Sequence, residues 1–190
     1  MPGNAPPLTD EKALLLAYIA QQREGLRNAA FGLTEEQARL TPTAGTLSIG
    51  GLIKHVAATE RGWIDMALQR PAVADTEEYL AGFRLGEGES VAGVLATYAE
   101  VAAETEAAIA GVDLDQPVPV PKGVPWFPQD VEAWSVRWVL LHLIEELARH
   151  AGHADIVRES IDGATMYELM AGVEGWPETP WLKPWRLPEG

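Results

Sequence analysis

The 190-residue sequence contains no cysteine. This absence excludes a disulfide framework, a cysteine nucleophile, and any zinc or iron site with sulfur ligands. A reaction that uses a thiol would therefore have to take that thiol from a second molecule. Long apolar runs are missing as well, because no segment approaches the roughly 18 uninterrupted apolar residues that indicate a membrane-spanning helix.

Basic residues are scarce. The sequence has 14 lysines and arginines and 28 aspartates and glutamates, which gives a net charge of −14. A surface this acidic repels phosphate backbones and anionic lipid headgroups, so we expect neither a nucleic acid nor a membrane as a partner. The N-terminus carries no basic or apolar targeting segment. With 47% hydrophobic and 22% charged residues, the composition is that of a folded chain. We expect one cytoplasmic domain over residues 1–190.

Four long helices are predicted from apolar periodicity and from the residues that can cap them. A serine or threonine stands at the start of each one: Thr9, Ser48, Ser90 and Ser135. The predicted helices cover about 9–31, 48–70, 90–110 and 135–161. No segment shows the alternation of a strand. The expected fold class is therefore all-α, a four-helix bundle with its core at about 9–163.

The connections between these helices are long and irregular. Residues 71–89 are expected to form a connection with one short helical piece at about 76–81. Five prolines between 112 and 129 exclude a helix or a central strand and predict an extended crossover. Trp126 and Phe127 supply apolar contacts with which this crossover can wrap against the bundle.

The C-terminal segment 164–190 is rich in tryptophan and proline. It contains Trp176, Trp181 and Trp185. Because large aromatic side chains gain much from burial, we expect these tryptophans to pin the tail to the bundle.

The four histidines are unevenly distributed, with three of them in the last predicted helix: His142, His150 and His153. At about 100° per residue, with His142 at zero, Glu146 falls near 40°, His150 near 80° and His153 near 20°. The same arc holds large apolar residues, so we expect these four side chains on the buried face. A buried carboxylate needs a neighbouring positive charge, and a divalent cation supplies one.

Glu146 and His150 have the spacing of two ligands on neighbouring helical turns. His55 in the second predicted helix is the remaining histidine and the expected third ligand. Two imidazoles and one carboxylate leave coordination positions open, which is typical of catalytic metal sites. Zinc is the preferred ion for this set, with nickel, iron and manganese as alternatives.

Interpretations without a metal also fit this arrangement of histidines and glutamate. A glutamate four residues before a histidine is common by chance, and Arg149, at about −20° on the same arc, can neutralise Glu146 on its own. We predict His153 and His142 as catalytic groups that move a proton. The alternatives for His142 are a supporting contact to the ligands or a core position, and for His153 an additional ligand or a core position.

The histidine-bearing segments resemble the DinB/YfiT-like superfamily, particularly its actinobacterial branch of uncharacterised and mycothiol-linked proteins. The resemblance lies in Trp-Val-Leu-Leu-His-Leu-Ile-Glu-Glu-Leu-Ala-Arg-His-Ala-Gly-His-Ala-Asp at 138–155, in Thr-Leu-Ser-Ile-Gly-Gly-Leu-Ile-Lys-His-Val at 46–56 and in Glu-Arg-Gly-Trp at 60–63. It covers about 9–163, and Glu146 is similar to the ligand in the metal-binding domain of mycothiol-dependent maleylpyruvate isomerase. His153 departs from the glutamine that many members carry.

This resemblance implies an up-down-down-up bundle with one divalent metal held by His55, Glu146 and His150. It also implies a low-molecular-weight thiol as cosubstrate and assembly into a homodimer. We therefore expect a metal-dependent thiol transferase of the mycothiol type, whose partners are a small-molecule thiol and an electrophile. The alternatives are a metal-dependent hydrolase, a metal-stabilised stress-response or binding protein without turnover, and a protein without metal.

Overall fold

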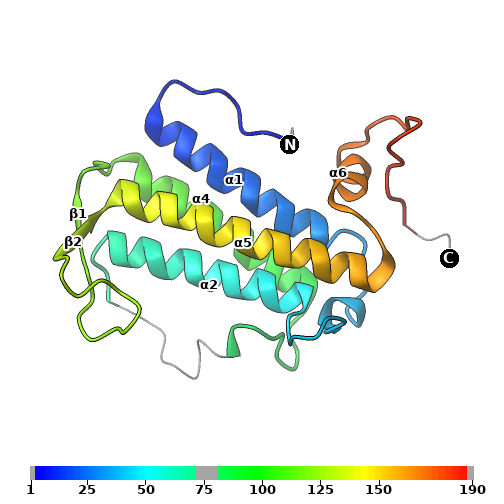
Figure 1. The fold of residues 1–190 in the computed structure, drawn as a ribbon, viewed down its shortest axis with the longest axis horizontal. Coiled ribbons are helices and arrows are strands. Elements are labelled where there is room, and N and C mark those ends of the chain that lie inside the picture. Colours follow the sequence, from blue (N-terminus) through cyan, green and yellow to red (C-terminus); the bar gives the residue numbers. More distant parts are fainter. Residues whose placement is uncertain (1–2, 72–80, 188–190) are drawn as a thin grey trace.

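The computed structural model describes residues 3–71 and 81–187. Four long helices lie side by side as a bundle (Figure 1). They are α1 (Glu11–Ala29), α2 (Ile49–Ala67), α4 (Val91–Ala110) and α5 (Val136–Asp162). The all-α fold and the positions of the four helices are thereby confirmed. The predicted helical piece at 76–81 lies outside the described residues, apart from Ala81.

Side-chain caps begin each of the long helices. The Oγ atoms of Ser48, Ser90 and Ser135 accept a hydrogen bond from the backbone N–H three residues later, as the sequence predicts. At α1 the predicted cap was wrong by one residue, because Asp10 rather than Thr9 accepts the bond from the backbone of Ala13, at 2.8 Å. The caps satisfy first-turn donors that lack a partner within the helix.

The helices run up, down, down and up. Glu11 pairs with Arg137 at the start of α1 and α5, and the carbonyl of Ala29 accepts from Arg158 near their ends, so these two helices are parallel. Helices α2 and α4 are also parallel, because Lys54 binds Glu89 just before α4 and contacts further along both helices follow in the same order. Helix α2 is antiparallel to α5.

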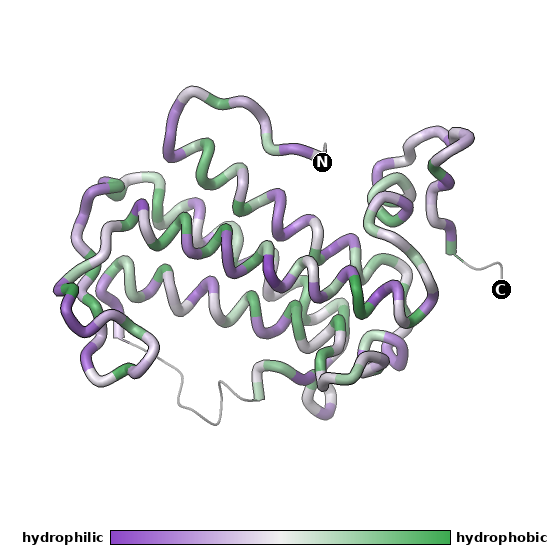
Figure 2. The backbone as a smooth tube through the Cα atoms, viewed as in Figure 1, coloured by the Kyte–Doolittle hydropathy of each residue, from purple (hydrophilic) through white to green (hydrophobic). Residues whose placement is uncertain are grey.

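Apolar residues form two core clusters, one toward each end of the bundle. One contains Leu52 and Val56 of α2 with Ala154 of α5, and the other contains Ile64 of α2 with Leu143 of α5. Hydrophobic and hydrophilic residues alternate along each long helix (Figure 2). Within 3–71 and 81–187, no helix combines the length and the apolar character needed to cross a membrane.

The crossover between α4 and α5 contains a short ladder that the sequence did not predict. Strand β1 (Pro117–Pro119) pairs antiparallel with β2 (Ala133–Ser135). Prolines are tolerated because this two-stranded ladder consists of edges alone. The expected wrapping is correct for Phe127, which packs against Trp63 and Trp134, and wrong for Trp126, which is 79% exposed.

The tail begins with a further helix, α6 (Met166–Glu174), which the sequence reading missed. Its signals were a capping box between Thr165 and Glu168 and a left-handed Gly175 at its end. The expectation that tryptophans pin the tail is correct for Trp185, whose ring packs on Phe31, and wrong for Trp181, which is 80% exposed.

Candidate metal centre

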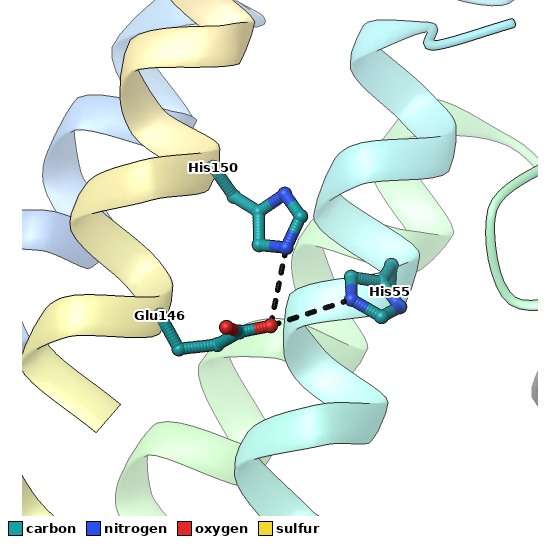
Figure 3. Close-up of side chains that lie close together, drawn as sticks. All are labelled: His55, Glu146 and His150. Atoms are coloured by element: carbon teal, nitrogen blue, oxygen red, sulfur yellow. Dashed lines mark hydrogen bonds and ion pairs between the residues drawn. The ribbon is translucent and has the colours of Figure 1, made fainter. Parts of the chain in front are cut away.

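Three predicted ligands from two helices meet at one point of the bundle (Figure 3). His55 comes from α2, while Glu146 and His150 come from α5 and lie one turn apart. One ligand atom from each lies within 4.8 Å of the other two. The four-residue spacing and the antiparallel packing of α2 on α5 therefore bring together the residues that the sequence singled out.

The glutamate occupies the middle of this group. Oε1 of Glu146 is 3.2 Å from Nε2 of His150 and 3.7 Å from Nε2 of His55. The two imidazole rings are 4.8 Å apart between centroids and stand edge to face. All three side chains thus direct a potential ligand atom toward one small volume.

The donor set and its spacing fit a divalent ion such as zinc. Ligand atoms at about 2.1 Å from a tetrahedral ion are ~3.4 Å from one another, and the two glutamate-to-histidine separations bracket that value. Two imidazoles with one carboxylate suit zinc, nickel, iron or manganese. Three protein ligands leave room for one exogenous ligand.

The surroundings of the cluster differ between its members. The side chain of His55 is 3% exposed, and those of His150 and Glu146 are 11% and 23% exposed. Phe83 stacks on His55 with ring centroids 3.8 Å apart, and Thr59 Oγ1 lies 3.4 Å from His55 Nε2. The ligands are therefore covered on the His55 side and accessible on the Glu146 side.

The histidines determine the electrostatics of Glu146. Hydrogen bonding to His150 and then to His55 holds the pKa of the Glu146 carboxyl well below its usual range. Arg149 is exposed, so the interpretation in which it neutralises Glu146 loses its support. The carboxylate is ionised and faces two imidazoles, which is the state that a metal ligand requires.

The buried face of α5 is rotated from the arc that the sequence analysis assumed. Fully buried positions such as Leu143 and Ala154 lie about 100° or more from His142 on the helical wheel. His142, Glu146 and His153 therefore stand at its border and are half-buried, not buried. The expected buried face differs from the observed one because α5 packs against α1 on one side and against α2 on the other. The histidine pattern indicated only the face toward α2, and α1 covers a further face.

The two additional histidines flank the ligands on α5. His142 stacks on Trp138 with ring centroids 5.1 Å apart, and its Nδ1 lies 3.4 Å from a carboxylate oxygen of Glu145. The ring of His153 is 5.5 Å from that of His150. Nδ1 of His150 and Nδ1 of His153 are both buried, and neither has a hydrogen-bond partner among the described residues.

Two further residues at the site were not predicted from the sequence. Thr59 stands four residues after His55, and this spacing on α2 was the signal that could have found it. Phe83 follows a connection whose path no periodicity specifies. Its position is fixed by Gly51, where an added Cβ would lie 2.0 Å from the Phe83 carbonyl oxygen, so a larger residue would push this segment away from α2.

Comparisons with known proteins identify the family and support the fold. Among solved structures, the crystal structure of a conserved protein from Enterococcus faecalis matches with a TM-score of 0.62 at 15% identity, over 83% of this chain and 100% of that one. A likeness at this identity shows the fold alone. No curated protein matches the sequence. The family model described as mycothiol-S-transferase matches residues 14–163, which is most of the chain, and the protein therefore belongs to the mycothiol S-transferase family.

Proposed function

We propose that this protein is a metal-dependent transferase that joins a mycothiol-type thiol to an electrophile. The observation that carries the proposal is the convergence of His55, Glu146 and His150, whose ligand atoms lie within 4.8 Å of one another. Membership of the mycothiol S-transferase family supports a thiol as the cosubstrate. The lack of cysteine adds support, because the sulfur nucleophile has to come from outside the chain.

The three ligands have complementary tasks in this proposal. His55 and His150 offer neutral nitrogen atoms, and Glu146 offers a negative oxygen that offsets part of the charge of the ion. A bound divalent ion, with zinc preferred, would supply the Lewis acidity that makes a thiolate available at neutral pH. Phe83 excludes water from the His55 side, and the partly exposed Glu146 side is where a small molecule can approach.

His153 and His142 are the proposed proton-moving groups. His153 lies beside His150 and keeps a buried Nδ1 that the described residues leave unpaired. His142 stands one turn before Glu146, and its Nδ1 lies 3.4 Å from a carboxylate oxygen of Glu145. Either imidazole can accept the thiol proton as the carbon–sulfur bond forms, and it releases that proton to solvent after the leaving group, bromide in the case of monobromobimane, has departed.

The test is a titration of cobalt-loaded protein with mycothiol, followed by absorption spectroscopy. We expect the cobalt spectrum to change on addition of the thiol, and we expect turnover with an electrophile such as monobromobimane to depend on the ion. The Glu146→Ala variant is the negative control, and Arg149→Ala is a matched control that leaves the ligands intact. A spectrum that mycothiol does not alter would overturn the thiol proposal, and ester hydrolysis without thiol would identify a hydrolase.

A further inference from the structure

An aromatic cluster extends from the metal centre along the seam between α2 and α5. We call it the aromatic strip, and it consists of Trp63, Phe127, Trp134, Trp138 and His142. The rings of Trp134, Trp138 and His142 are nearly parallel, with centroids 4.5 and 5.1 Å apart and interplanar angles of 3° and 7°. Trp63 from α2 closes one side of this stack and lies 4.5 Å from His142.

The aromatic strip is continuous with the ligands in sequence and in space. Trp138, His142, Glu146 and His150 follow one another at four-residue steps on α5, so they form one row on the helix surface. Eight residues of helix rise separate Trp138 from Glu146, a distance of about 12 Å along the axis. A molecule with its sulfur at the ligands can therefore lie along this row.

Core packing explains why some rings of the aromatic strip are aromatic, but not all of them. Trp134 is 8% exposed and belongs to a core cluster, as expected of a structural aromatic residue. Trp138 is 38% exposed, and the side chain of His142 is 25% exposed. The inner rings thus hold the outer rings in place, and the outer rings present aromatic surface to solvent beside the metal centre.

The charges around the aromatic strip decide which ligand it suits. Glu145, with a side chain 76% exposed, lies 3.4 Å from His142, and Glu146 stands one turn further on. In a protein with a net charge of −14 these carboxylates disfavour an anionic occupant. A neutral polyol ring fits, because its C–H face packs on an aromatic ring while its hydroxyl groups donate to carboxylate oxygens.

We propose that the aromatic strip binds the two-ring polyol part of the thiol cosubstrate, with Trp138 as its main contact. The inference rests on the proposed function for the position of the sulfur atom. Mycothiol carries a cysteinyl group on an amino sugar that is joined to a cyclitol, and both rings are neutral. Mycothiol bound with its sulfur at the metal centre and its two rings along the aromatic strip would therefore occupy one continuous surface.

The first test compares mycothiol with N-acetylcysteine, which has the same thiol group but no rings. Affinities for zinc-loaded full-length protein are measured by calorimetry. We expect Trp138→Leu to reduce the preference for mycothiol about tenfold, as is usual for the loss of one large aromatic contact, with N-acetylcysteine binding unchanged. Trp138→Phe keeps a ring and should lose less than about threefold. Trp181→Leu, at the 80% exposed tryptophan of the tail, is the matched control.

The second test needs neither metal nor thiol. The probe is N-acetylglucosaminyl-inositol, which lacks the cysteine and keeps the amino sugar neutral. It is added to metal-free protein while the indole N–H signals of the seven tryptophans are followed by NMR. We expect the sugar to shift the indole signal of Trp138, which is the signal missing from the spectrum of Trp138→Leu. Any shifts of neighbouring tryptophan signals should disappear in that variant, and the signal of Trp181 should not shift. This test keeps the two proposals apart, since the sugar can bind even if no thiol coordinates the ion.

Two results would overturn the inference while leaving the metal-dependent thiol chemistry intact. One is an unchanged preference for mycothiol in Trp138→Leu together with no response to N-acetylglucosaminyl-inositol. The other is an effect of Trp138→Leu confined to the KM of an aromatic electrophile such as 1-chloro-2,4-dinitrobenzene, which would assign the aromatic strip to the other substrate. Thermal unfolding of each variant verifies that it folds.

Discussion

Oε1 of Glu146 lies 3.2 Å from Nε2 of His150 and 3.7 Å from Nε2 of His55, so one carboxylate oxygen faces two imidazoles from different helices. The two imidazoles stabilise this half-buried carboxylate in its ionised form, and a divalent cation held at the same point would compensate its charge further. In the proposed function, an ion held by this carboxylate would also activate the thiol.

Replacement of Glu146 by glutamine tests the carboxylate as a ligand. Glu146→Gln keeps the size of the side chain and removes its charge, and we expect the affinity for zinc to fall at least about 100-fold. Competition with a chromophoric chelator measures the affinity. His142→Gln alters a neighbouring side chain that is not a proposed ligand and should change the affinity less than about threefold. Equal losses in both variants would contradict the assignment.

Removal of the metal tests the link between the site and the stability of the fold. A ligand at about 100 times its Kd stabilises a protein by roughly 2.7 kcal/mol, provided that the unfolded chain does not bind it. We therefore expect a chelator to lower the unfolding temperature by several degrees. His55→Ala should unfold at the same temperature with or without chelator. Scanning calorimetry of both proteins at one zinc concentration makes the comparison, and a chelator-sensitive His55→Ala would point to ligands elsewhere.

The buried pair Arg23 and Glu60 should dominate stability in the bundle interior. The guanidinium binds both carboxylate oxygens at 2.6 and 3.1 Å, Thr105 donates to the same carboxylate, and the two charged side chains are 2% and 0% exposed. Glu60→Gln leaves the buried guanidinium with the half-exposed Glu106 as its remaining carboxylate partner, and we expect a loss of about 3 kcal/mol. Urea unfolding measures this loss. The double variant Arg23→Met with Glu60→Leu should lose less than Glu60→Gln, and a larger loss would contradict the explanation.

The candidate metal ligands could be singled out from the sequence because the geometry of two of them is local. The spacing between Glu146 and His150 alone sets one turn of helix, and His55 was the remaining histidine. Helix starts were predictable at Ser48 and Ser135 for the same reason, since a cap acts within three residues. These predictions needed no knowledge of how the helices pack.

The unpredicted features depend on contacts between distant segments. Phe83 reaches His55 because its backbone rests on Gly51, and no pattern around residue 83 encodes that approach. The exposure of Arg149 depends on which neighbours cover α5, and helical periodicity alone cannot say where a buried face is centred. Asp155 is half-buried for the same reason, because the neighbours of α5 decide which of its polar residues are covered.

Asp155 makes stability depend on pH in a predictable direction. Burial, with a smaller contribution from Glu159, raises the pKa of its carboxyl from 3.8 to about 6. The folded state then binds the proton more tightly than the unfolded state, so stability falls as pH rises through this interval and the loss is complete above about pH 6. We expect Asp155→Asn to be about 2 kcal/mol more stable than the parent at pH 7.5, after a discount for partial exposure.

The gain from Asp155→Asn should shrink below about 1 kcal/mol at pH 4, where the native carboxyl is already protonated. Urea unfolding at the two pH values gives the difference. Glu159→Gln, at an exposed neighbour, should show a smaller gain. A gain that is equal at pH 4 and pH 7.5 would mean that the amide adds a contact and that ionisation of Asp155 is not the cause.

The attachment of the C-terminal tail to the bundle should depend on Trp185 and not on Trp181. The Trp185 ring lies 4.8 Å from the Arg158 guanidinium and 5.4 Å from Phe31, and an added Cβ on Gly32 would lie 2.4 Å from it. Trp185→Ala removes these contacts, and we expect a loss of about 2 kcal/mol.

Limited proteolysis and urea unfolding together test this difference. In Trp185→Ala the tail loses its anchor, so we expect cleavage after residue 175 at low protease concentration, while Trp181→Ala should behave like the parent because its ring is 80% exposed. Gly32→Ala gives an independent variant, since it crowds the same ring and also strains a backbone with φ of +71°. Rapid cleavage in Trp181→Ala but not in Trp185→Ala would reverse the assignment of the anchor.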